Sequence, residues 1–125
     1  VGRRRRDAEE DPSVLITFDE LALGFANVEA RFHRRVQSDV DEVLRRYYGV
    51  SQRLGEDFFA ELQIGIRKAI ANPQYFHFDR SGLRRCNLDR FPYHFLYDIR
   101  GSYVRVWVLR HNRRNPEFGL RRFSS

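Results

Sequence analysis

The sequence predicts an α+β domain in which an antiparallel helical hairpin packs on a three- to four-stranded antiparallel sheet. Two observations predict this fold class. Apolar residues recur at helical spacing in the middle of the chain and at alternate positions towards its C-terminus. A short apolar stretch ahead of the helices adds a first strand. At 125 residues, the chain has room for one domain with a modest core.

The first two elements are a strand over residues 28–32, VEARF, and a helix after it. The helix is indicated by one apolar stripe, made of Val36, Val40, Val43, Leu44, Tyr47 and Tyr48. We expect the polar residues to occupy the other side of this helix, namely Asp39, Asp41, Glu42, Arg45 and Arg46. Gly49 is well placed to end it.

A second helix is predicted by a further stripe, made of Leu54, Phe58, Phe59, Leu62, Ile66, Ala69 and Ile70. Asn72 and Pro73 form its stop signal. A short link over residues 50–53 should fold the two helices into an antiparallel hairpin. Gly65 costs about 1 kcal/mol within a helix, so we expect a close packing contact there.

Three strands are predicted after the irregular segment 72–82. Residues 82–88, GLRRCNL, form the first, and Tyr93 to Ile99 alternate as the second. Val104, Val106 and Val108 alternate as the third, after a turn over residues 100–102. Aromatic residues at this spacing are expected in the core, namely Tyr93, Phe95, Tyr97 and Trp107. Cys86 reads as a small buried hydrophobe.

Residues 1–27 are expected to be a separate acidic arm, ahead of a domain over residues 28–125. The stretch from residue 7 to residue 27 holds six acids and no base. One hypothesis is that the arm is an annotation artefact, with Val28 at an internal GTG start. The other is that the arm folds over the basic part of the chain and masks it.

The charge of the chain is concentrated at its C-terminal end. Residues 80–125 carry eleven arginines against three acids, within a total net charge of +6. Such a field attracts polyanions without saying which. The single cysteine and the absence of a Cys/His cluster give no sign of a disulfide, a metal or a cofactor. With no apolar run of about 20 residues, we expect a cytoplasmic protein without membrane contact.

The two helical stripes and the segment LRRCNLDRFPYHFLYDIRGSYVRVWVLRHNRRNPEF carry a resemblance to a known family. Over residues 28–123 the chain resembles the RelE/ParE superfamily of bacterial toxins from type II toxin–antitoxin modules, the plasmid-stabilisation type. The marks of the resemblance are an arginine-bearing strand, an FPY entry, an aromatic strand, a valine-rich strand and a terminal H-x-x-R-x-P. It implies a microbial-ribonuclease-type fold and a cognate antitoxin protein that binds the toxin in a hetero-oligomer.

The resemblance leaves two mechanisms open. ParE-like toxins inhibit DNA gyrase by binding, whereas RelE-like toxins are metal-independent endoribonucleases that cleave mRNA on the ribosome. RNA cleavage needs a base, an acid and fixed positive charge. The candidate catalytic residues are His111, Arg85 and Arg113. The candidate residues for binding the target or the antitoxin are Arg84, Arg85, Arg90, Tyr97, Arg110, Arg113 and Arg114.

Two departures from the RelE-like pattern favour the ParE-like interpretation. The expected lysine-rich patch is absent, and the C-terminal tail has Phe118 and Phe123 where RelE-like toxins tend to carry a catalytic tyrosine. Arginine can supply charge but is a poor base. We therefore expect His111 to shape the turn that carries Arg113 and Arg114. Ribosome-dependent mRNA cleavage is the alternative, and a non-toxic basic nucleic-acid-binding domain is a further one.

Overall fold

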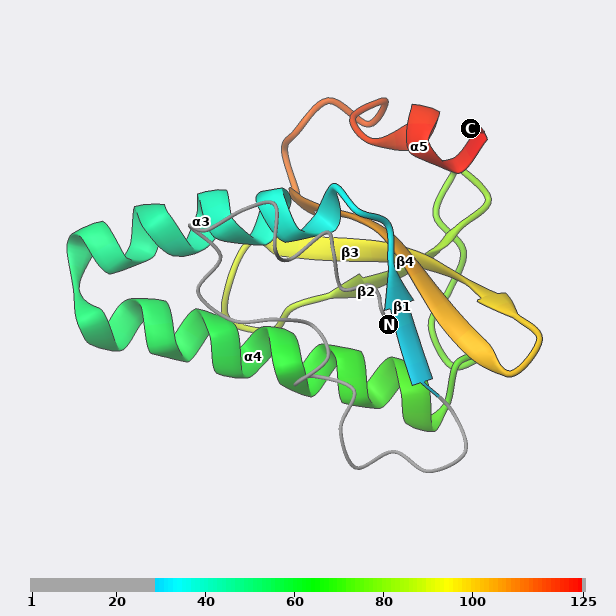
Figure 1. The fold of residues 1–125 in the computed structure, drawn as a ribbon, viewed down its shortest axis with the longest axis horizontal. Coiled ribbons are helices and arrows are strands. Elements are labelled where there is room, and N and C mark those ends of the chain that lie inside the picture. Colours follow the sequence, from blue (N-terminus) through cyan, green and yellow to red (C-terminus); the bar gives the residue numbers. More distant parts are fainter. Residues whose placement is uncertain (1–28, 125) are drawn as a thin grey trace, which may run out of the picture.

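The computed structural model describes residues 29–124, which form one α+β unit (Figure 1). The acidic arm proposed for residues 1–27 lies outside the described residues. The elements follow the order expected from the sequence: β1 (Glu29–Phe32), α3 (Val36–Val50), α4 (Gln52–Ala71), β2 (Arg84–Asn87), β3 (Tyr93–Arg100), β4 (Tyr103–His111) and α5 (Leu120–Ser124). Among the described residues, no helix is long and apolar enough to cross a membrane.

The helical hairpin is tighter than its sequence suggested. Helix α3 continues through Gly49 to Val50, so the expected end at Gly49 is wrong. A single residue, Ser51, then joins the helices: its backbone N–H donates to Tyr47, and its hydroxyl accepts the N–H of Leu54 at 3.0 Å as the cap of α4. Ser51 thus provides a hydrogen bond to the backbone of each helix, so a link of one residue is enough for the hairpin.

The sheet is mixed, which corrects the expectation of an antiparallel one. Its strand order is β1-β4-β3-β2, and β2, β3 and β4 are antiparallel neighbours. Strand β1, however, runs parallel to β4, with Ala30 beside Val104. Alternating apolar residues indicate strands but not their partners, and the helical hairpin, β2 and β3 all separate β1 from β4 along the chain. No turn therefore fixes its direction.

The hairpin covers one face of the sheet and encloses the main core (Figure 1). The helical stripes and the aromatic residues Tyr93, Phe95 and Tyr97 meet there, as expected. Gly65 lies against the sheet: a Cβ at this position would sit 3.2 Å from Phe95 and 3.3 Å from Leu88. The close contact expected at this glycine is therefore one between α4 and the sheet.

A β-bulge changes the face to which β4 directs its side chains. Val104 and Val106 belong to the core under the hairpin, but Trp107 and Val108 both belong to a second cluster on the other face. The register between β3 and β4 shifts between Leu96 and Tyr97, which leaves one extra residue on β4. The expected alternation of three valines on one face is thus wrong at Val108.

The C-terminal segment covers part of the second face. Phe118 and Leu120 pack against a small cluster made of Leu83, Leu96, Trp107 and Val108. The sequence predicted no element here, yet α5 lies across this end of the sheet (Figure 1). The sheet consequently has apolar contacts on both faces, which explains why the first five residues of β3, Tyr93 to Tyr97, are all buried.

Candidate functional site

His111 ends β4 and holds the basic turn that follows it. Its Nδ1 atom accepts the backbone N–H of Arg113 at 3.0 Å, and its carbonyl oxygen accepts the N–H of Arg114 at 2.9 Å. The ring packs edge-on against Tyr93, with centroids 5.0 Å apart. Because a backbone amide can only donate, the neutral imidazole carries its proton on Nε2. His111 therefore shapes this turn, as the sequence suggested.

Arg113 and Arg114 are exposed on that turn. The guanidinium of Arg114 lies 3.9 Å from the ring centroid of Phe118, which holds it by a cation–π contact. The next residues form a tight connection, in which the side chain of Asn115 accepts the N–H of Glu117 at 2.9 Å. The two arginines thus project from an ordered backbone that His111 and Asn115 fix.

The three candidate catalytic residues do not come together. Arg85 stands opposite Leu96 and contacts Asp79 and Asn87 on the face away from the hairpin. His111 stands opposite Tyr93, whose side chain belongs to the core under the hairpin. The side chains of Arg85 and His111 therefore leave opposite faces of the sheet. Of the two candidate catalytic arginines, only Arg113 lies beside His111.

The other candidate binding residues are dispersed. Arg84 donates to the carbonyl oxygen of Phe76 at 2.8 Å and lies 4.2 Å from the ring of Phe78. Tyr97 is fully buried, and its hydroxyl donates to the carbonyl oxygen of Pro73 at 2.6 Å. Arg90 is exposed beside α4, where it pairs with Asp57 at 3.4 Å. Arg84 and Tyr97 thus contact the segment before β2, and Arg90 contacts α4.

Arg110 is buried in a polar cluster that the sequence did not reveal. Its Nε donates to Nε2 of His94 at 2.9 Å, and its Nη1 donates to the carbonyl oxygens of Pro116 and Phe118 at 2.6 and 3.0 Å. Its Nη2 lies 3.8 Å from the carboxylate of Asp79. The guanidinium thus ties the C-terminal segment to the sheet, and its role is structural.

His94 is neutral at the centre of this cluster. Nδ1 lies 2.8 Å from Oδ1 of Asn112, so the hydrogen bond from Arg110 to Nε2 places the proton on Nδ1. Burial lowers the pKa of His94 to about 4, with the positive charges of Arg85 and Arg110 acting in the same direction. Burial also works to raise the pKa of Asp79, but hydrogen bonds from Ser81 and the charge of Arg110 hold it below its usual range.

Asp39 and Arg122 form a second buried pair outside the expected site. Both carboxylate oxygens of Asp39 accept from the guanidinium, at 2.7 and 3.0 Å. The same carboxylate accepts the N–H of Leu109 at 3.1 Å, and Arg122 donates to the carbonyl oxygen of Trp107 at 3.1 Å. The expectation that Asp39 and Asp41 lie on the solvated side of α3 is wrong, because both are buried.

A third charged group lies around Trp107, on the sheet face away from the hairpin. The guanidinium of Arg31 lies 4.1 Å from the ring of Tyr103, and that of Arg105 lies 4.8 Å from the ring of Trp107. His33 also packs on Trp107, at 5.7 Å. We call this surface the Trp107 face, and its charged members include Asp98 together with Arg31, Arg34, Arg35, Arg100 and Arg105.

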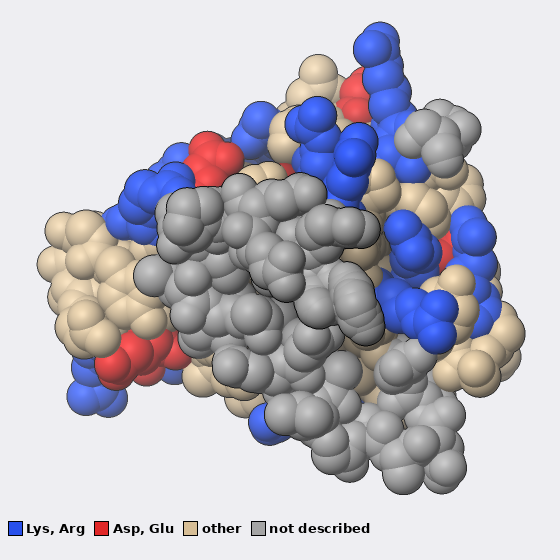
Figure 2. All heavy atoms as spheres, viewed as in Figure 1, with Lys and Arg blue, Asp and Glu red and all other residues tan. Residues whose placement is uncertain are grey.

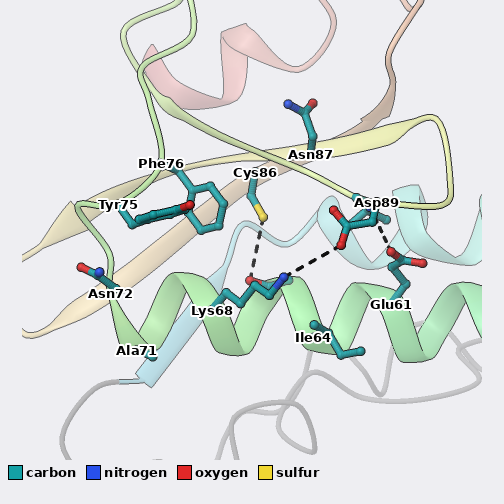
Figure 3. Close-up of a pocket in the computed structure, with 12 residues that line it drawn as sticks. Glu61, Ile64, Lys68, Ala71, Asn72, Tyr75, Phe76, Cys86, Asn87 and Asp89 are labelled. Carbon is teal, nitrogen blue, oxygen red and sulfur yellow. Dashed lines mark hydrogen bonds and ion pairs between the residues drawn. The ribbon is translucent and has the colours of Figure 1, made fainter.

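A cavity of about 440 Å³ lies between α4 and β2 (Figure 3). Ile64 and Lys68 of α4 line one side, and Tyr75, Phe76 and Cys86 line the other. Burial raises the pKa of the Cys86 thiol to about 12, so the thiol stays protonated and is a poor nucleophile. None of the candidate site residues lines this cavity.

Comparison with models of known protein families and with curated proteins finds no match for this chain. Within residues 29–124, no group of three or more His, Cys, Asp or Glu side chains is placed to hold a metal ion. The described residues contain one ordered basic turn at His111, one buried polar cluster around Arg110, one buried Asp39–Arg122 pair and one arginine-rich face.

Proposed function

We propose that this chain is the toxin of a type II toxin–antitoxin pair and that it inhibits DNA gyrase by binding, in the manner of the ParE-like branch. The order of strand, helical hairpin and three further strands supports the resemblance on which this proposal rests. So does the ordered turn over the H-x-x-R-x-P segment, where His111 accepts the N–H of Arg113. A cognate antitoxin would form the hetero-oligomer that neutralises the toxin.

The observation that carries the choice of binding over cleavage is the separation of Arg85 from His111. Their side chains leave opposite faces of the sheet, as the pairing of Arg85 with Leu96 and of His111 with Tyr93 requires. Attack of a 2′-hydroxyl on a phosphate needs the base and the charge that stabilises the phosphorane within reach of the same atoms. A binding protein has no such requirement.

The proposal assigns the exposed arginines of the His111 turn to the contact with the target or the antitoxin. Arg113 and Arg114 are exposed, and their backbone is fixed by hydrogen bonds. Arg110 and Tyr97 are left out of this contact, because both are buried and their polar groups have partners within the chain. Exposed charged groups at the edge of a protein interface mainly speed association and select the partner.

One observation favours cleavage of translated mRNA as the second candidate. The ring of His111 is only partly buried, and its Nε2 makes no hydrogen bond within the described residues. That atom could exchange a proton beside the two arginines of the turn. The two candidates differ in what a substitution of His111 does.

Induced expression without an antitoxin, followed by assays of plasmid supercoiling and of ribosome-bound mRNA, tests the proposal. We expect growth arrest, relaxed plasmid and intact mRNA, all retained in His111→Ala. The pair Arg113→Ala with Arg114→Ala should lose the arrest. The matched control is Arg45→Ala with Arg53→Ala, two exposed arginines of the hairpin, which should keep it.

Two outcomes would overturn this proposal. Codon-spaced cuts in mRNA that disappear in His111→Ala would establish the ribonuclease instead. Normal growth with full expression of the folded chain would leave a non-toxic basic domain.

A further inference from the structure

The cavity between α4 and β2 has the size and the lining of a small-molecule site. Its volume of about 440 Å³ lies within the range of about 300 to 1,000 Å³ that is usual for such sites. Ile64 and Ala71 of α4 line one side, and Tyr75, Phe76 and Cys86 line the other (Figure 3). Because most of this lining is apolar, a molecule that fills the cavity must itself be largely apolar.

The charged residues that border the cavity do not favour an ion. Glu61 and Asp89 are acidic and Lys68 is basic, with its Nζ 4.0 Å from the carboxylate of Asp89. An anion would therefore meet two carboxylates, and a cation would meet the ammonium group. Figure 2 shows Lys and Arg side chains gathered over the β3–β4 hairpin and around α5, whereas the cavity is lined by α4, β2 and the segments beside β2. A neutral ligand has neither unfavourable contact.

Tyr75 offers an aromatic surface at this cavity. Its side chain is 68% exposed, and its ring stands at 89° to the ring of Phe76, with centroids 5.0 Å apart. Phe76 packs against the main core and so fixes this side of the cavity. A planar ring can stack on such a surface, and it loses less conformational entropy on binding than a flexible chain of the same area. The lining therefore favours a planar aromatic ligand.

Asn87 presents its backbone to the cavity. In Figure 3 its side chain points away from α4, whereas that of Cys86 points toward it. Asn87 belongs to β2, the last strand of the sheet, so one edge of its backbone faces β3 and the other faces outward. The N–H of the next residue, Leu88, donates to the carbonyl oxygen of Tyr93 in β3 at 2.9 Å. Because that peptide bond is trans, the carbonyl group of Asn87 points to the outer edge.

The N–H of Asn87 points to the same outer edge as its carbonyl. In an antiparallel pair, residues bonded to the neighbouring strand alternate with residues whose backbone groups face outward. Arg85, two positions earlier, agrees with this, because its N–H donates outward to the carbonyl oxygen of His77 at 3.0 Å. Among the described residues, the backbone N–H and C=O of Asn87 have no such partner. One donor and one acceptor thus stand side by side at the cavity, as they would for a further strand.

We infer that this cavity binds a neutral, planar aromatic molecule with an amide-type edge, such as a lactam or a nucleobase. The ring lies against Tyr75 and Ile64, and its edge exchanges two hydrogen bonds with the N–H and C=O of Asn87. This inference goes beyond the proposed inhibition of gyrase, because these residues are not those of the His111 turn and the binding can be tested with small molecules alone. The two claims can therefore fail independently.

The test titrates the full chain with isoquinolin-1(2H)-one, a neutral two-ring lactam, and follows the backbone amide signals by NMR. We expect saturable shifts at Asn87 and Lys68 with a Kd of about 5 mM or lower, as suits a ligand of about eleven non-hydrogen atoms. The N-methyl derivative lacks the donor and should bind at least about fivefold more weakly. The anion 1-naphthoate, of similar shape, should also bind at least about fivefold more weakly, because of the two carboxylates.

Two pairs of variants separate the backbone contact from the ring contact. Asn87→Pro removes the outward N–H, which an edge strand tolerates, and should weaken lactam binding at least about fivefold. Its control, Asn87→Ala, removes a side chain that points away from α4 and should keep the affinity within about twofold. Tyr75→Ala should weaken binding at least about threefold. Its control is Phe78→Ala, an exposed ring of the same segment that lies against Arg84 and should have no effect.

Should Asn87→Pro fail to fold, as judged by circular dichroism, the comparison of the lactam with its N-methyl derivative on the unaltered chain decides the backbone contact. Four results would overturn the inference. They are the absence of saturable shifts at Asn87 and Lys68 up to about 10 mM lactam, equal affinity for the lactam and its N-methyl derivative, tighter binding of 1-naphthoate than of the lactam, and changes of the same signals with protein concentration alone. The last would mean that a second copy of the chain fills the cavity.

Discussion

The carboxylate of Asp39 and the guanidinium of Arg122 form a bidentate pair that closes the open edge of β4. Strand β1 ends at Phe32, so β4 lacks a neighbour beyond Val106 on this side. There the carboxylate accepts the N–H of Leu109 and the guanidinium donates to the carbonyl oxygen of Trp107. A helix and the C-terminal segment thus supply the hydrogen bonds that another strand would make.

Removal of the carboxylate should be costly. We expect Asp39→Ala to lower the free energy of unfolding by about 3 to 5 kcal/mol, because it removes the buried carboxylate that pairs with the Arg122 guanidinium and accepts the N–H of Leu109. Urea denaturation measures the change. The control is Glu42→Ala, an exposed acid on the same helix, which should change it by no more than about 0.5 kcal/mol. A cost below about 1 kcal/mol for Asp39→Ala would show that the pair is solvated.

The buried His94 should make stability depend on pH. Its pKa lies at about 4 in the folded chain against 6.5 ordinarily, so between these values only the unfolded chain binds the proton. The free energy of unfolding should therefore increase by about 3 kcal/mol as pH is raised from about 4 to 6.5, and the same amount should be lost when pH is lowered over this range.

Comparison with His94→Gln isolates this contribution. His33, whose pKa is also lowered to about 4, is present in both proteins, so the difference between their stability curves reports His94 alone. Stability from urea denaturation at a series of pH values gives the two curves. Parallel curves across this range would contradict a neutral, buried His94.

The same substitution should destabilise the protein at Arg110 and leave its stability almost unchanged at Arg113. Arg110→Met leaves His94, Pro116 and Phe118 without their donor, so we expect a loss of about 3 kcal/mol in the free energy of unfolding. Arg113→Met alters an exposed side chain and should change stability by less than about 0.5 kcal/mol. Equal effects on thermal unfolding would be incompatible with the placement of Arg110 in the cluster.

Two glycines of the hairpin should give opposite signs. Nothing lies within 4 Å of a Cβ built on Gly49, so Gly49→Ala should raise the free energy of unfolding by about 0.5 to 1 kcal/mol through helix propensity alone. A Cβ on Gly55 would lie 2.6 Å from Cγ of Tyr48, so Gly55→Ala should lower it by about 1 to 3 kcal/mol. A stabilised Gly55→Ala would show that the helices are packed less closely.

Local patterns in the sequence were sufficient for most elements of this fold. Helical and alternate spacing located both helices and β1 to β4, because each pattern arises from contacts with a single core. The parallel pairing of β1 with β4 and the change of sheet face at Trp107 were not predicted, since neither a strand partner far along the chain nor a bulge produces a periodic pattern in the sequence. Helix α5 escaped because its contacts depend on a sheet face that forms only in the folded chain.

The candidate site was predicted less completely than the fold. The turn-shaping role of His111 is present, because it depends on residues two and three positions away. Asp39, His94 and Arg110 are buried by partners far along the chain, so their spacing made them look like surface residues. To predict the burial of Arg110, one would have had to know which face of the sheet the residues of β4 occupy after the bulge. The alternation of apolar residues assigned that face wrongly.

The supercoiling activity of purified gyrase, titrated with the full purified chain, tests the proposed function most directly. We expect the wild-type chain to inhibit and His111→Ala to keep inhibiting, weakened by no more than about tenfold, since the proposal gives His111 the role of positioning the arginines of the turn and not that of moving a proton. Unimpaired supercoiling at saturating chain, together with cleavage of ribosome-bound mRNA that His111→Ala abolishes, would contradict the proposal.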